Sequence, residues 1–284
     1  MPVDLHTHTY FSDGTMSPED LLQKAENESL TALAVTDHDE IGANYIAQQY
    51  AQSLKLEFVS GVEFSIDIAL PGTAHLHLLG LFLEIENDEL KSVLNDLRNA
   101  RQTRAGTIIK KLQDYGLDVS ENELDVIVGQ GSAGRPHVAQ LLMDKNVVDS
   151  VWEAFHKFLS KDRPGYVPKK KLKLQTAIDL IHKAKGLAIL AHPISLKQRT
   201  YKDTEAFLKE LKSIGLDGVE AYYASHTRNF TSYLLNAAKR NNLLISGGSD
   251  FHGSIKPDTE LGIGRGNLSV PDQVFFDLKN AVSK

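Results

Sequence analysis

The chain has 284 residues, 42% of them hydrophobic and 24% charged, and its formal net charge is -6 at pH 7. This is the composition of an ordinary soluble globular protein, and the length suits two average domains or one large barrel with an insertion. The acidic balance argues against broad electrostatic binding to long nucleic acid, and the absence of cysteine excludes disulfides and thiolate metal ligands.

No apolar run approaches the ~20 residues of a transmembrane helix, and the N-terminus lacks the basic and apolar regions of a signal peptide. We therefore expect a cytoplasmic protein with no membrane partner and no obligate protein partner. Any bound metal must be held by His, Asp and Glu, which favours manganese, zinc, iron or magnesium over cluster-type sites.

The first fourteen residues place two histidines and an aspartate after a short apolar run. His6 and His8 are separated by one residue, so in a strand both side chains would project from one face. Two neighbouring imidazoles form half of a tetrahedral metal site, and Asp13 adds an oxygen ligand nearby. Because a His-x-His pair is common by chance, the prediction of a metal site depends on the rest of the chain.

Strand and helix patterns alternate after Gly14. Ser17-Pro18-Glu19-Asp20 predicts a helix start, because Ser17 can cap and proline suits the first helical position. The apolar runs are typical of buried parallel strands, and repeated strand–helix units predict a parallel sheet with its chemistry at the carboxyl ends of the strands. The second predicted strand, 30–36, ends in Asp37-His38-Asp39. The helix 45–54 follows it. The third predicted strand, 56–60, ends in Gly61-Val62-Glu63.

Residues 64–83 predict a local hairpin, with Pro71-Gly72 as its turn. His75 and His77 share a face of its second run. We expect His77 to be the metal ligand and His75 to be an outer-shell or surface histidine.

From about residue 90 the pattern becomes helical, and few strand-like runs interrupt it until Arg163-Pro164-Gly165. Residues 96–164 are therefore predicted to be a helical insertion. Lys169-Lys170-Lys171 follows it and is interpreted as a solvated loop, with a phosphate clamp as the alternative. The predicted helices cover 97–115, 120–127, 135–144 and 149–159.

The alternation resumes in the last third of the chain and gives about seven strand–helix units in all. Right-handed crossovers close such a series into a barrel, whereas an open doubly wound sheet would gather its functional residues at one switch point. The predicted strands here are 187–191 before His192, 218–223 before His226, and 243–246 before Ser249-Asp250-Phe251-His252; the helices are 174–185, 203–214, 228–241 and one after 269–272.

Acid and histidine side chains recur at the ends of these apolar runs. One metal ion needs three or four protein ligands. The nine side chains at these positions therefore suffice for three ions if carboxylates bridge two of them. Unpaired histidines would be costly to bury, which argues against ordinary core residues. The candidate ligands are His6, His8, Asp13, His38, Glu63, His77, His192, Asp250 and His252.

Six short motifs together resemble those of the PHP (polymerase and histidinol phosphatase) superfamily. They span nearly the whole chain: His6-Thr7-His8 with Asp13-Gly14, Thr36-Asp37-His38, Gly61-Val62-Glu63, His77, Ala191-His192-Pro193 and Ser249-Asp250-Phe251-His252. The resemblance implies an α/β fold, a distorted (β/α)7 TIM-like barrel formed by residues 1–95 and 165–284, with residues 96–164 as a helical cap over the substrate.

The same resemblance implies a centre of three divalent ions, manganese being favoured over zinc, iron and magnesium. The implied ligands are His6, His8, Glu63 and Asp250 for one ion, Glu63, His77 and His192 for a second, and Asp13, His38 and His252 for a third. Glu63, Asp250, Asp13 and His252 are the residues expected to be catalytic. Asp37 is a candidate for orienting a ligand imidazole, and the sequence does not choose the general acid.

Gly134-Arg135-Pro136-His137 resembles a segment of the small stand-alone phosphoesterases of this superfamily, which include nucleoside 3',5'-bisphosphate phosphatases and exonucleases of short RNA. The resemblance implies that Arg135 contacts a substrate phosphate and that His137 and His226 line the same pocket. A surface arginine at a helix start is an equally good interpretation of Arg135.

The predicted function is hydrolysis of phosphate esters of small nucleotides, or of 5'-phosphorylated short RNA, by metal-activated water. No stable complex with long nucleic acid is expected. One alternative is an amidohydrolase-like hydrolase of C–N bonds, although such barrels use a lysine where Glu63 stands here. A histidinol-phosphate-type phosphatase and a non-catalytic module are the others.

Overall fold

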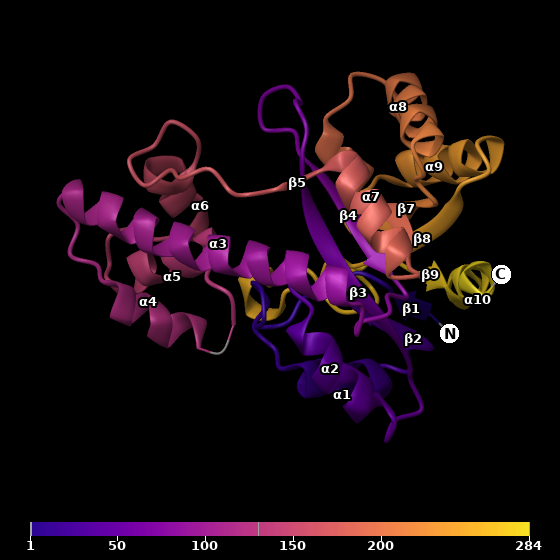
Figure 1. Cartoon of the computed structure of the whole chain (residues 1–284), viewed down its shortest axis with the longest axis horizontal. Coiled ribbons are helices and arrows are strands. Elements are labelled where there is room, and N and C mark those ends of the chain that lie inside the picture. The colour runs from indigo at the N-terminus through magenta and orange to yellow at the C-terminus, as the bar shows by residue number, and fades with distance from the viewer. Residues whose placement is uncertain (1, 130, 284) are drawn as a thin grey trace.

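A sheet of nine strands, rolled into a nearly closed barrel, forms the body of the computed structural model, which describes residues 2–129 and 131–283 (Figure 1). The strand order is β8-β7-β6-β4-β3-β2-β1-β9, and β5 pairs with β3. Backbone hydrogen bonds from Leu5 N to Gly247 O and from Asp250 N to His6 O join the end of β1 to β8 and so bring the first and last parallel strands together. The strands are β1 Pro2–Asp4, β2 Ala32–Val35, β3 Glu57–Asp67, β4 Leu76–Leu81, β5 Leu172–Lys173, β6 Leu187–Leu190, β7 Gly218–Tyr223, β8 Leu244–Gly248 and β9 Val270–Pro271.

The predicted hairpin distorts an otherwise mainly parallel barrel. Strand β4 pairs antiparallel with both β3 and β6, whereas β1–β2–β3 and β6–β7–β8 are parallel. The prediction that the third strand ends at Glu63 was wrong, because pairing with β4 and β5 carries β3 on to Asp67. Glu63 therefore lies inside a paired strand, which fixes its position more firmly than a loop would.

The barrel helices lie close to their predicted ranges. The predicted N-cap is confirmed, since Ser17 Oγ accepts a hydrogen bond from Asp20 N at 3.0 Å. All four residues of β2 are buried, as the continuous apolar run predicted. The helices around the barrel are α1 Pro18–Asn27, α2 Gly42–Ala51, α7 Leu174–Lys183, α8 Tyr201–Ser213, α9 Arg228–Arg240 and α10 Asp272–Val282.

The predicted helical segment projects to one side of the barrel (Figure 1). Its helices are α3 Asp88–Asp114, α4 Glu121–Val128, α5 Arg135–Asp144 and α6 Val151–Ala154, followed by a π-helical turn, Phe155–Leu159. Leu90 and Leu94 of α3 pack in the barrel core, while Ile108 and Leu112 belong to a separate cluster with α4 and α5. The predicted boundary between residues 95 and 96 falls inside α3, which is therefore shared between the two bodies.

Within the ranges that the structure describes, no helix has both the length and the hydropathy needed to cross a bilayer.

Helices α8 and α9 are joined by Glu205, which offers a test of stability away from the barrel mouth. Its carboxylate accepts hydrogen bonds from Arg240 Nη2 at 2.7 Å and Tyr233 Oη at 2.8 Å. The Arg240 bond is the main cause that lowers the pKa of Glu205 to about 2. A carboxyl group whose pKa is lowered on folding stabilises the folded state. This stabilisation is complete above the unfolded pKa, near 4.5, and is lost as the pH falls toward 2.

We expect Glu205→Gln to lower the free energy of unfolding at pH 7 by about 1 kcal/mol, since Arg240 is half exposed and solvent screens the pair. Urea titrations of both proteins should show this difference constant from pH 8 to about 5 and shrinking below about 4.5. A difference that grows on acidification would contradict the role of the pair.

Candidate metal centre

The mouth of the barrel holds a cavity of about 320 Å³ whose walls are mainly acid and histidine side chains. The segment after β1 brings Asp13 to this cavity and sets His6 and His8 against its lining carboxylate Glu63, and the loop after β8 brings Asp250 and His252. Buried Asp4 ties the two segments together by accepting hydrogen bonds from Ser249 N at 2.9 Å and Gly262 N at 2.8 Å. The cavity is therefore built where the two ends of the barrel meet.

Glu63 is the hub of this cavity. Its side chain is 1% exposed, and imidazole nitrogens of five histidines lie within 2.7–3.3 Å of its two oxygens. Burial alone would raise the pKa of this carboxyl, but the neighbouring histidines, led by His38 and His77, hold it well below its usual value. A permanently ionised carboxylate at this place can bridge two cations. The five histidines are His6, His8, His38, His77 and His192.

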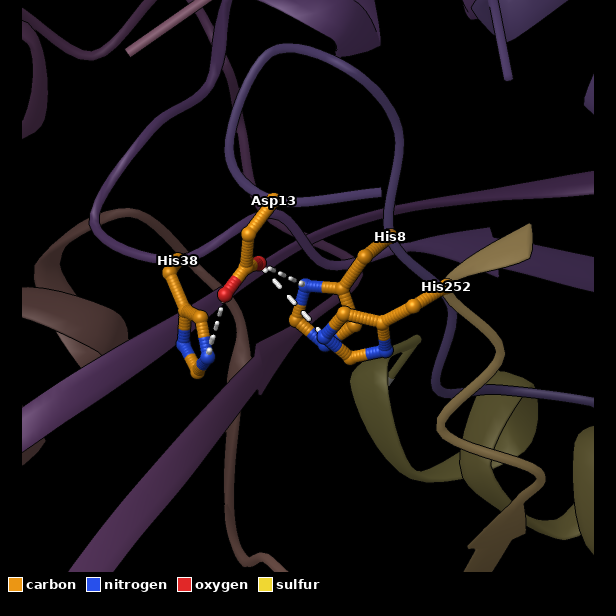
Figure 2. A group of neighbouring side chains, drawn as sticks. All are labelled: His8, Asp13, His38 and His252. Atoms are coloured by element: carbon orange, nitrogen blue, oxygen red, sulfur yellow. Dashed lines mark ion pairs between the residues drawn. The ribbon is translucent and has the colours of Figure 1, made fainter. Parts of the chain in front are cut away.

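Asp13 organises a second group with His8, His38 and His252 (Figure 2). Its carboxylate lies 3.4 Å from His252 Nε2 and 3.9 Å from both His8 Nδ1 and His38 Nε2. Burial opposes ionisation here too, yet His38 and His252 hold the pKa of Asp13 well below its usual value. The four side chains come from three separate parts of the chain.

Asp250 organises a third group. Its Oδ1 lies 3.3 Å from His8 Nε2 and 3.6 Å from His6 Nε2, while its Oδ2 accepts hydrogen bonds from Tyr223 Oη at 2.9 Å and Lys256 Nζ at 2.7 Å. One oxygen thus faces the imidazoles and the other is fixed by neutral and cationic donors. This division orients the carboxylate for a cation on the imidazole side.

The geometry fits divalent metal ions. Of the buried side-chain atoms that make no hydrogen bond among the described residues, five belong to this centre: His6 Nε2, His8 Nε2, His38 Nδ1, His192 Nδ1 and Glu63 Oε2. The 3.2–3.6 Å separations between these imidazoles and the carboxylates are close to the ~3.0–3.4 Å between two ligands on an ion with bonds of ~2.1 Å. Such buried groups need partners, and cations would supply them.

The structure brings all nine predicted ligands into overlapping groups, too many for a single ion. His75, which we expected to lie outside the ligand set, also joins His77 and His192 in one of them. The assignment of particular ligands to particular ions stays a prediction. The groups are His8, Asp13, His38 and His252; His6, His8 and Asp250; His6, Glu63 and His192; His38, Glu63 and His77; and His75, His77 and His192.

The three predicted substrate contacts lie outside the inner group. Arg135 donates to Leu159 O at 3.2 Å and stacks over the Phe155 ring, while His137 Nδ1 accepts from Gly134 N at 3.1 Å and caps α5. Pro136, between them, does line the cavity. His226 is buried beyond Tyr223, with its ring centroid 5.2 Å from that of the tyrosine.

Glu220 was missed by the sequence reasoning. It is fully buried, its Oε1 lies 2.9 Å from His6 Nδ1, and its Oε2 accepts a hydrogen bond from His192 N at 2.6 Å. A carboxylate inside the apolar run 218–223 was the available signal, since such a charge is rarely buried without a partner. Glu220 orients two candidate ligands from outside the ion positions.

Two other interpretations change. Asp37 makes no direct hydrogen bond to a ligand imidazole among the described residues; it accepts from Thr9 N at 2.8 Å and from Ser12 Oγ at 2.5 Å, and Ser12 Oγ in turn lies 3.4 Å from His8 Nδ1. Asp37 therefore shapes the loop that carries Asp13 and reaches His8 only through Ser12. The solvated-loop interpretation was wrong for Lys169, which pairs with Asp39 at 2.5 Å and donates to Ser65 Oγ at 2.6 Å. The buried carboxylate of Asp39, adjacent to His38, attracts this lysine out of solvent.

Arg101 of α3 links the helical segment to the centre. Its side chain donates to His38 O at 2.8 Å and to Ala133 O at 3.2 Å, just before α5. One buried guanidinium therefore holds both a candidate ligand turn and the segment leading to Arg135.

We expect Arg101→Ala to lower kcat/KM about tenfold, because losing a buried charged donor to His38 O costs on the order of 1–3 kcal/mol. Arg98→Ala is the matched control, since Arg98 lies one turn earlier on the same helix and is half exposed. Steady-state kinetics and melting temperatures should be measured for both. Equal kinetic losses in the two variants would show that the effect is not specific to the His38 contact.

A barrel with clustered carboxylates and imidazoles at its mouth defines a metal-dependent hydrolase. The model of the PHP domain matches residues 4–214, so the chain belongs to the PHP family. It is a metal-dependent phosphoesterase of that family, as the sequence motifs predicted.

Two similar proteins are named for activities on RNA or on nucleotides. A 5'-3' exoribonuclease of Haemophilus influenzae is 30% identical over 88% of this chain and 89% of its own. A 3',5'-nucleoside bisphosphate phosphatase of Chromobacterium violaceum is 29% identical over 88% and 87%.

Two solved structures share the fold over nearly the whole chain. A Bifidobacterium adolescentis protein, described as a metal-dependent phosphoesterase, has a TM-score of 0.82 at 26% identity and covers 98% of this chain and 96% of its own. A Chromobacterium violaceum protein, described as an amidohydrolase with bound sulfate and no metal, has a TM-score of 0.81 at 26% identity over 99% and 96%. The predicted distorted barrel is confirmed by these likenesses.

Proposed function

We propose that this phosphoesterase acts on small phosphorylated nucleotides, such as nucleoside 3',5'-bisphosphates, or on short RNA with a 5'-phosphate. The observation that carries the proposal is the single cavity in which Asp13, Glu63 and Asp250 each stand among several imidazoles. The names of the relatives, an exoribonuclease and a bisphosphate phosphatase, support the nucleotide class.

We further propose three divalent ions, manganese being favoured. When bound, such ions act as Lewis acids and lower the pKa of bound water to about 7. Three ions would bring +6 against -3 from Asp13, Glu63 and Asp250, so the mouth would attract a phosphate although the chain as a whole is acidic.

The chain's own residues supply the remaining contacts. Lys256 lines the cavity and donates one hydrogen bond to Asp250 Oδ2, so its ammonium has two further N–H donors for a phosphate oxygen. Arg135 has no carboxylate within ion-pair distance among the described residues, and its planar guanidinium suits a phosphate approaching over Pro136. Its neighbour His137 holds the first turn of α5 in place.

The C–N hydrolase alternative is disfavoured by the centre itself. Such barrels usually place a lysine between two metals, and the place between the imidazoles is held here by the Glu63 carboxylate. Lys169 is engaged by Asp39, and Lys256 approaches only the outer oxygen of Asp250.

The test measures phosphate release from 3'-phosphoadenosine 5'-phosphate and from histidinol phosphate, and mononucleotide release from a 5'-phosphorylated trinucleotide RNA, each with manganese. We expect turnover of at least one nucleotide substrate well above that of histidinol phosphate. Preference for histidinol phosphate, or no release from any of the three, would contradict the proposed substrate class.

A further inference from the structure

A second, larger hollow lies beside the metal cavity and has no part in the centre described above. It has a volume of about 730 Å³ and runs between the first two turns of α9 and the loop 265–269. We call it the α9 groove. Asn267 Nδ2 donates to Ala224 O at 3.0 Å and fixes this loop against the end of β7.

Tyr223 is the wall between the α9 groove and the metal cavity, since it lines both. Its hydroxyl donates to Asp250 Oδ2 at 2.9 Å, and its ring centroid is 5.5 Å from that of His192. A linear substrate with one group at the metal centre would therefore reach the groove by passing only the Tyr223 side chain.

The groove combines one free cation with aromatic and hydroxyl groups. Among the described residues no carboxylate lies within ion-pair distance of Arg228, whereas the other arginine of the groove, Arg265, is engaged by Asp258 at 2.9 Å. Tyr222 and Tyr223 are half-buried and supply aromatic surface. Binding sites for single-stranded nucleic acid usually combine a cation, which contacts a phosphate, with aromatic rings, which contact a base.

His226 adds an unsatisfied polar group to the groove wall. The side chain is 4% exposed, Nδ1 lies 3.0 Å from Ala221 O, and Nε2 has no hydrogen-bond partner among the described residues. Burial is the main cause that lowers the pKa of His226 to about 4, so the ring is neutral and one nitrogen stays an acceptor. A buried acceptor without a donor is the kind of group that a ligand hydroxyl satisfies.

From these observations we propose that the α9 groove binds the second nucleotide of a short RNA whose first, 5'-phosphorylated nucleotide lies over the metal centre. Arg228 contacts the phosphate that joins the two nucleotides, and the tyrosines contact the base. This inference rests on the proposed function and narrows it: the site is extended for oligonucleotides and holds a nucleoside bisphosphate in its first position alone.

The test compares substrates of increasing length in Arg228→Ala and in the unaltered enzyme. A 3',5'-bisphosphate, a 5'-phosphorylated dinucleotide and a trinucleotide of one sequence are assayed with manganese. We expect KM for the di- and trinucleotide to rise about tenfold, with kcat and the bisphosphate kinetics unchanged. The log–log salt dependence of kcat/KM for the dinucleotide should become shallower by about 0.7, the value for one phosphate contact on a single strand.

Lys239→Ala is the matched control, because this exposed cation lies near the other end of α9 and outside the groove. It should leave all substrates unaffected. Equal losses for the bisphosphate and the dinucleotide in Arg228→Ala, or no loss for either, would overturn the inference.

Binding separates the groove from the proposed activity. If the unaltered protein cleaves none of these esters, the proposed function fails, and the groove is judged by calorimetric titration with the same dinucleotide. Roughly tenfold weaker binding to Arg228→Ala than to Lys239→Ala supports the groove, and equal binding to both overturns it.

Discussion

Glu63→Gln should reduce phosphoesterase activity by about 10³-fold or more and should lower the amount of metal that the protein retains. Five imidazoles lie around this one carboxylate, so the neutral amide removes the charge on which they converge. A loss of several kcal/mol of electrostatic stabilisation corresponds to this change in rate. The substitution preserves shape, and β3 should keep its pairing with β4.

The control for this prediction is Glu57→Gln, which changes an exposed residue of the same strand that pairs with Lys279. Activity with saturating manganese and bound metal by mass spectrometry should be compared for both variants. Wild-type turnover and metal content in Glu63→Gln would mean that the carboxylate does not bridge cations.

The second large effect is expected at Glu220, where replacement by glutamine should weaken metal retention and activity by about 10–100-fold. Glu220 orients His6 through Nδ1 and the backbone of His192 through its N–H. A glutamine keeps the volume but loses the charge that fixes the His6 tautomer. Higher manganese in the assay should restore part of the activity, because the defect lies in ion affinity.

Glu210→Gln, an exposed change on α8, is the control for Glu220. Titration of each variant with manganese should give a higher half-saturating concentration only for Glu220→Gln. A purely lower kcat with unchanged manganese dependence would argue that Glu220 supports the fold and not the ions.

Much of the architecture could be predicted because the barrel repeats one pattern. Continuous apolar runs such as 30–36 read as buried strands, and the residues that follow them gather at one end of a parallel sheet. His38 and His192 could be placed together for this reason, although 154 positions separate them.

What could not be predicted depends on contacts between distant segments. Residues 64–67 were predicted as part of a separate hairpin, whereas pairing with β4 and β5 makes them a continuation of β3 beyond Glu63. Lys169 looks like a member of a surface charge run until Asp39 is seen beside it. The helix-start pattern of Arg135 is the same whether its guanidinium faces a phosphate or the Phe155 ring.

The central claim is that one basin at the barrel mouth holds several divalent ions and uses them on phosphate esters. The most direct test is metal counting on protein reconstituted with manganese, together with phosphate release from 3'-phosphoadenosine 5'-phosphate before and after chelation. We expect about three ions per chain, with activity that disappears on chelation and returns with manganese. A chain that binds no ion, or one whose activity is the same with and without metal, would contradict it.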